Sequence, residues 1–229
     1  MTIERMSDAE RSELQHTARR VLAERSPMER VRELLDDPRG FDPALFAGLV
    51  DLGWTGMHLP EAMGGFGASF ADTAVVISEL GRAVVAGPLV SSAIVASGAL
   101  LATSNTAVAK EMLPAIVDGS MIATVAIAGA GGHYSSAAVG PQWMPADGGG
   151  VVLHGAATFV LDAEVADVLI VFARGEMGIV AAVVDRNAPG VVVTPTATLD
   201  QTRRPAQVAF DRVRLQAGAL LAEPTDGAA

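Results

Sequence analysis

The chain has 229 residues, half of them hydrophobic, which is enough for one large domain or two small ones with a sizeable buried core. Its 16 Lys and Arg against 26 Asp and Glu give a net charge of −10 without one-sided blocks, so we expect no nucleic-acid partner. The absence of Cys excludes disulfides, thiolate metal sites and cysteine nucleophiles, as is usual in a reducing compartment.

The N-terminal half, from Ser7 to Asp118, has apolar residues at helical spacing and is predicted to be a helical bundle. The segment Met1–Arg11 lacks the apolar core of a signal peptide, so we expect a cytoplasmic protein. Asp42-Pro43 predicts the start of a helix that ends at Asp51–Gly53. A further helix is predicted from Ser69–Asp72 through Arg82.

Two long uncharged spans could be mistaken for membrane segments. Ala83–Ala109 runs 27 residues without a charge, but Gly87-Pro88 and Ser104-Asn105 favour two buried helices with a break. Gly119–Ala146 contains several Gly and Pro residues, which exclude one continuous helix. We therefore expect no membrane span.

After Asp118 the pattern changes to short β-branched runs separated by Gly, Pro and Asp. These runs predict strands at Met121–Ile127, Val151–Leu153, Val168–Phe172, Ile179–Val184, Val191–Val193 and Val208–Phe210. Helices followed by strands indicate an α+β chain, an all-helical bundle and then an antiparallel β-barrel or sandwich. The expected division is a helical domain at 1–119, a β domain at 120–222 and a disordered tail at 223–229.

Few residues suggest a reaction by themselves. The run Gly129–Gly132 resembles a phosphate loop only weakly, since Tyr134 stands where the dinucleotide fingerprint needs a third Gly, and a flexible turn is the simpler interpretation. The four His have no metal-ligand spacing, although His133 lies beside this run. Arg203-Arg204 could bind an anion, but a solvated or interface pair is the favoured interpretation.

The segment Leu52–Gly67, which reads LGWTGMHLPEAMGGFG, closely resembles the N-terminal signature of acyl-CoA dehydrogenases. Other motifs of that family follow in order, and together they cover nearly the whole chain. They are Glu79-Leu80-Gly81-Arg82, Leu113-Pro114 to Gly119, Val183-Val184-Asp185, Pro189-Gly190-Val191 and Val208–Val213.

The resemblance implies the first two of the family's three parts, the helical and middle β domains. The part that resembles these two domains stops near Leu221, where the C-terminal helical domain would begin. Because the family's catalytic base usually lies in that third part, no catalytic residue is predicted in this chain. The resemblance further implies FAD as cofactor, acyl-CoA as substrate, and a homo- or hetero-oligomer of similar subunits.

The cofactor-binding residues implied by the resemblance are Val125, Ile127, Ala128, Phe159, Val160 and Leu161. The family's Thr-Glu-Pro-x-x-Gly-Ser-Asp loop falls without gaps on Ala128–Ser135, which removes a hydroxyl that bonds the flavin. A shifted alignment would instead place Gly129–Gly132 on its Gly-rich end. The family's Trp-Ile-Thr falls on Phe159-Val160-Leu161, so an aromatic ring is kept and a donor is lost.

Three functions remain open from the sequence. The first is an FAD-associated acyl-CoA dehydrogenase chain, incomplete on its own, that oxidises a CH–CH bond of acyl-CoA in fatty acid or steroid side-chain metabolism. The second is a non-catalytic partner or scaffold subunit of a heteromeric acyl-CoA dehydrogenase. The third, a free-standing module that binds an apolar ligand, depends only on analogy of fold.

Overall fold

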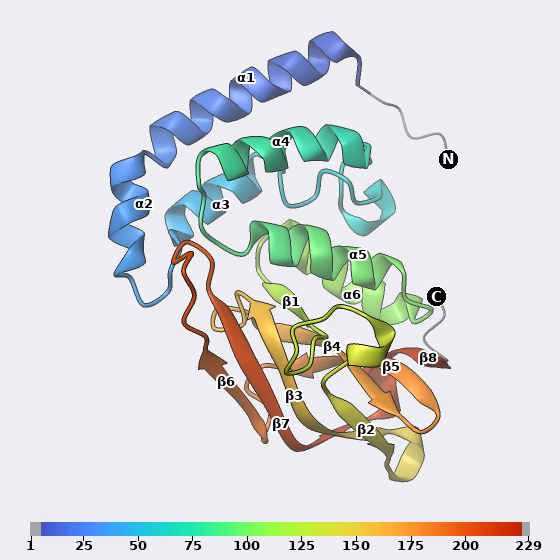
Figure 1. The fold of residues 1–229 in the computed structure, drawn as a ribbon. Helices are drawn as coiled ribbons and strands as arrows, with labels where there is room; N and C mark the ends of the chain where they lie inside the picture. Colours follow the sequence, from blue (N-terminus) through green and yellow to red (C-terminus); the bar gives the residue numbers. More distant parts are fainter. Residues whose placement is uncertain (1–5, 226–229) are drawn as a thin grey trace.

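The computed structural model describes residues 6–225, with helices in the first half and strands in the second (Figure 1). The helices are α1 (Asp8–Arg25), α2 (Met28–Leu35), α3 (Pro43–Asp51), α4 (Phe70–Arg82), the π-helix η2 (Leu89–Ala96), α5 (Ser97–Leu101) and α6 (Thr106–Val117). Short 3-10 turns occur at Glu61–Met63, Ser136–Ala138, Asp147–Gly149 and Ala217–Ala219. The α+β class expected from the sequence is confirmed.

Capping groups explain where the helices begin. Asp42 accepts hydrogen bonds from the amides of Ala44 and Leu45, with Pro43 in the first turn of α3, as predicted. Ser69 and Asp72 form a reciprocal capping box at the start of α4, which confirms the predicted start there.

The uncharged span before α6 is helical and broken, as expected. The π-helix η2 continues directly into α5, and residues 102–105 separate α5 from α6. Among the described residues, no helix combines the length and apolar character needed to cross a bilayer.

The second half forms a sheet of eight strands. They are β1 (Ala123–Ala126), β2 (Gln142–Pro145), β3 (Val151–Leu161), β4 (Val168–Gly175), β5 (Gly178–Asp185), β6 (Val191–Pro195), β7 (Pro205–Leu215) and β8 (Leu220–Thr225). The order is β6-β7-β3-β2-β4-β5-β8, with β1 paired in parallel to β4. The sheet is mostly antiparallel, but β2 also meets β4 in parallel.

Strand β4 is buried on both faces. Its successive side chains point to opposite sides of the sheet and enter two different cores. Ile170, with Val168 and Phe172 beside it, packs into the core formed by the helices. Leu169 and Val171 pack into a second core between the strands. In Figure 1 the helices accordingly lie along one side of the β domain, and η2, which is continuous with α5, contacts β1.

The sequence did not predict two of the strands. β2 has Pro141 before it and Pro145 at its end, and proline is unfavourable within a strand. β8 lies at an edge of the sheet, and its pairing with β5 is not local in sequence. Because β8 extends through Thr225, the first residues of the predicted tail belong to a strand. The remainder, 226–229, lies outside the described residues.

A buried ion-pair cluster joins α1 to α4. The carboxylate of Glu79 is 2% exposed and accepts hydrogen bonds from Arg19, Arg82 and Gln15. Hydrogen bonding to Arg19, the largest cause, helps to lower the pKa of Glu79 to about 2. The cluster therefore favours the ionised carboxylate.

A second buried carboxylate joins the two halves of the chain. Asp162 follows β3, is 9% exposed, and accepts a hydrogen bond from the Ser91 hydroxyl of η2. Burial raises the pKa of Asp162, while Ser91 and the charge of Arg203 act in the opposite direction. The backbone of Asp162 is left-handed, with φ of 55°.

We expect Glu79→Gln to lower the free energy of unfolding by about 1–2 kcal/mol at pH 7, a modest value because both arginines are half exposed. The folded pKa lies below the unfolded one, so this stabilisation is present above pH 4.5 and is lost as the pH falls towards 2. Urea unfolding at several pH values measures it, with Glu111→Gln as the exposed control. Identical pH profiles for wild type and Glu79→Gln would contradict this role.

We expect Asp162→Asn to stabilise the chain relative to wild type at pH 8 but not at pH 3.5. The raised folded pKa means that Asp162 contributes stability below its unfolded pKa of 3.8 and loses it as the pH rises through the folded value. Asn still accepts the Ser91 hydrogen bond and tolerates a left-handed backbone. Thermal unfolding across this range, with exposed Asp211→Asn as control, tests the pH dependence; a constant difference between wild type and Asp162→Asn argues against it.

Candidate functional site

Five of the six implied cofactor residues lie where β1 ends beside the end of β3. After β1, Ala128 pairs with Val139 in an isolated bridge, and its carbonyl accepts the amide of Thr158 at 2.7 Å. The Thr158 hydroxyl donates to the carbonyl of Gly129 at 2.6 Å. We call Ile127, Ala128, Phe159, Val160 and Leu161 the platform.

The end of β3 turns two side chains outwards. The pairing of β3 with β7 shifts register between Ala157 and Val160, which marks a bulge. Phe159 takes a left-handed backbone with φ of 53° and is 43% exposed, and Leu161 is 38% exposed. Val160 between them is buried, so the platform presents an aromatic and an aliphatic side chain.

The structure places the six implied residues in different environments. Ile127 and Ala128 lie beside the end of β3, but Val125 packs against the helical core instead. The methyl group of Ala128 and the side chain of Val160 are fully covered. Of the six side chains, Phe159 and Leu161 are the exposed ones.

The Gly-rich loop that follows Ala128 forms hydrogen bonds within its own segment. The amide of Gly129 donates to Ala138, that of Gly132 to Gly129, and that of Gly140 to Ile127. A Cβ on Gly140 would lie 2.5 Å from the Cα of Gly129, so close backbone packing accounts for this pair of glycines. These internal bonds use amides that a phosphate-binding loop would present.

Sequence reasoning missed the polar groups that hold the platform. The Thr124 hydroxyl donates to the carbonyl of Leu161 at 2.6 Å, which ties β1 to the end of β3. The Thr158 hydroxyl and the Ser91–Asp162 contact were also not anticipated. A signal was present in Thr124, a polar residue within an apolar run, but its partner is distant in sequence.

The platform residues do not fit the polar edge of a flavin. An isoalloxazine ring carries nitrogens and carbonyls whose electronics depend on hydrogen bonds from the protein. None of the five platform side chains has a donor, and the carbonyl of Ala128 is already paired with the amide of Thr158. Among the described residues, the buried side-chain N and O atoms without partners are in His58, His154 and Arg174, all outside the platform.

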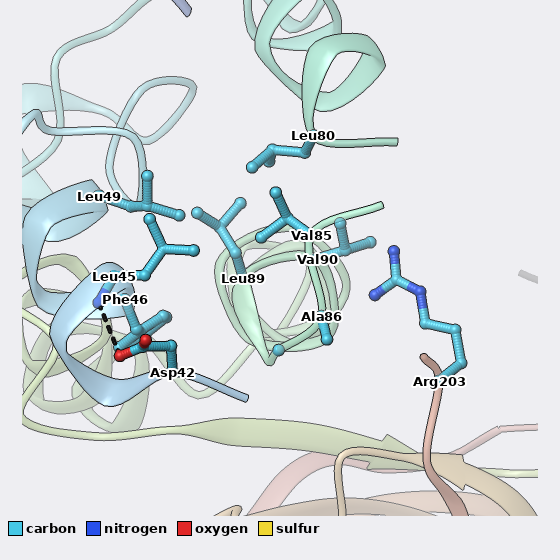
Figure 2. Close-up of a pocket in the computed structure, with 11 residues that line it drawn as sticks. Asp42, Leu45, Phe46, Leu49, Leu80, Val85, Ala86, Leu89, Val90 and Arg203 are labelled. Carbon is cyan, nitrogen blue, oxygen red and sulfur yellow. Dashed lines mark hydrogen bonds between the residues drawn. The ribbon is translucent and has the colours of Figure 1, made fainter. Parts of the chain in front are cut away.

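The two adjacent arginines have different surroundings. Arg204 donates to the carbonyls of Leu34, Leu35 and Pro38 at the end of α2, which is a structural contact between the halves. Figure 2 shows Arg203 reaching towards Val90 at the mouth of an apolar hollow. The free volume of this hollow, about 10 Å³, admits roughly one water molecule.

No group of three or more His, Cys, Asp or Glu side chains able to hold a metal ion occurs within residues 6–225. The nearest carboxylate to the platform in sequence, Asp162, is buried against Ser91. The site therefore offers apolar contact and shape, without an acid or base directed at a ligand.

Comparisons with known proteins agree with this fold. The family model described as "Acyl-CoA dehydrogenase, N-terminal domain" matches residues 8–120. Acyl-CoA dehydrogenase FadE27 of Mycobacterium tuberculosis is 32% identical over 170 residues, which are 74% of this chain and 44% of that protein. The chain spans about half the length of the relatives it matches.

Two solved structures match nearly the whole chain. The crystal structure of the ChsE4-ChsE5 complex from Mycobacterium tuberculosis has a TM-score of 0.84 at 26% identity, covering 96% of this chain and 58% of the matched one. The Tcur3481-Tcur3483 steroid ACAD G363A variant has a TM-score of 0.81 at 32% identity, covering 93% and 57%. With the helical half matched by its family model and both halves matched by solved structures, the chain belongs to the acyl-CoA dehydrogenase family.

Proposed function

We propose that this chain is a subunit of a heteromeric acyl-CoA dehydrogenase, which oxidises the acyl group of an acyl-CoA at a CH–CH bond. The observation that carries the proposal is the match to the ChsE4-ChsE5 complex over 96% of the chain. The match to a second named pair of subunits, Tcur3481-Tcur3483, supports it, and the description "steroid ACAD" favours a steroid side chain as the acyl group.

The reaction needs a base for the α-proton and an acceptor for the β-hydride, held on opposite sides of the acyl chain. Members of this family bind FAD, which supplies the hydride acceptor. Asp162 cannot act as the base in the geometry described, because its carboxylate is buried and bonded to Ser91. The platform residues likewise provide no group that accepts a proton.

Exposed apolar side chains favour association with another subunit. In the helical half, Phe66 is 62% exposed and Phe70 is 59% exposed, and both flank the start of α4. Phe159 and Leu161 add apolar surface on the platform. Large exposed apolar side chains of this kind are common at protein–protein contacts.

A second candidate function is a flavoprotein chain that binds FAD on its own platform. The retained aromatic side chain of Phe159, which is partly exposed, is the observation in its favour. The lack of side-chain donors counts against it. The two functions differ in whether this chain by itself binds FAD.

The test is to purify the tagged chain from its native host and identify what accompanies it. We expect stoichiometric co-purification of a different acyl-CoA dehydrogenase-family subunit, and reduction of an artificial electron acceptor that depends on acyl-CoA and requires both subunits. An untagged host strain is the control for non-specific capture.

A clean monomer over a wide concentration range, with no such partner, would be evidence against the heteromeric subunit. FAD that co-purifies with this chain alone would favour the second candidate. Steroid-derived and straight-chain acyl-CoA substrates compared in the same assay separate the two acyl classes.

A further inference from the structure

We propose that the platform of this chain is closed to the flavin ring, so that FAD in the assembly is held by the partner subunit. The closure of the platform depends only on its own contacts, whereas the placement of FAD on the partner depends also on the proposed heteromeric function.

Two backbone carbonyls of the platform are already paired. The carbonyl of Ala128 accepts the Thr158 amide, and the carbonyl of Leu161 accepts the Thr124 hydroxyl. The loop amides of Gly129 and Gly140 donate to carbonyls within the same segment. A flavin that took the Thr158 amide or the Thr124 hydroxyl as a donor would have to break one of these bonds, and the carbonyl left behind would need a new partner.

The platform also lacks side-chain donors. Ala128 is 0% exposed, so even a hydroxyl at this position would need new space. Leu161 is 38% exposed and can contribute only apolar contact. Burying the polar edge of a flavin against these residues would leave ring atoms without hydrogen bonds, which opposes binding.

The Gly-rich loop packs against Phe159. A Cβ on Gly132 would lie 2.9 Å from Cε2 of Phe159, so the loop backbone directly contacts the edge of the aromatic ring. The Tyr134 hydroxyl donates to the Phe159 carbonyl at 3.5 Å, a long bond from the same loop. The chain's own loop thus occupies part of the surface around this ring.

Leu161→Thr is the most direct test, because the side chain is partly exposed and a smaller residue introduces a hydroxyl without overpacking. We expect wild-type chain to bind added FAD only weakly, measured by the change in flavin fluorescence, and Leu161→Thr to bind FAD about two- to tenfold more tightly, the gain of one hydrogen bond. Leu199→Thr, at a fully exposed leucine between β6 and β7, is the matched control and should behave as wild type.

Ala128→Thr combined with Leu161→Thr restores both hydroxyls, and circular dichroism checks that it folds. Wild-type chain that takes up one FAD per copy would overturn the proposal. Equal FAD affinities of wild type and folded Leu161→Thr would also overturn it, since donors would not then limit binding. The FAD result is independent of co-purification, so a missing partner would contradict the heteromeric function while leaving the closed platform supported.

Discussion

The fold depends on strands that are buried on both faces. Along β4, alternate side chains enter the helical core and the core between the strands, as Ile170 and Leu169 do. A slip of one residue would exchange these sets and place each in the wrong core. This constraint fixes β1 against η2, with β4 paired beside β1, and it therefore determines where the platform lies relative to the helices.

Polar contacts supplement this packing at the junction of the two halves. The π-helix η2 supplies two buried hydroxyls. Ser91 donates a hydrogen bond to the carboxylate of Asp162, and Ser92 accepts one from the amide of Ala123. At the other end of the helical layer, the side chain of Asn105 donates to the carbonyl of Leu220, the first residue of β8. Because each group is satisfied only when the halves are docked, these bonds specify one arrangement in addition to contributing stability.

Local chemistry made part of the fold predictable from the sequence. The starts of α3 and α4 depend on caps within four residues, and strands β4 and β5 are continuous apolar runs. The parallel pairing of β1 with β4 could not be predicted, since it depends on partners about 45 residues apart. The bulge at Phe159 could not be predicted from the sequence either, because the left-handed backbone of Phe159 accompanies a register shift against β7.

The distinction between features set by local sequence and features set by distant partners applies to the site as well. Collinear motifs located Ile127, Ala128 and the segment Phe159–Leu161, but could not show that Val125 packs into the helical core. Glycines that resembled an anion loop are explained by the contact between Gly129 and Gly140. If flavin donors had been lost from a platform otherwise shaped for a ligand, unpaired polar groups would be expected around it. The observed hydrogen bonds from Thr124 and Thr158 instead pair the carbonyls of Leu161 and Ala128 within the chain, so these two platform groups need no ring as a partner.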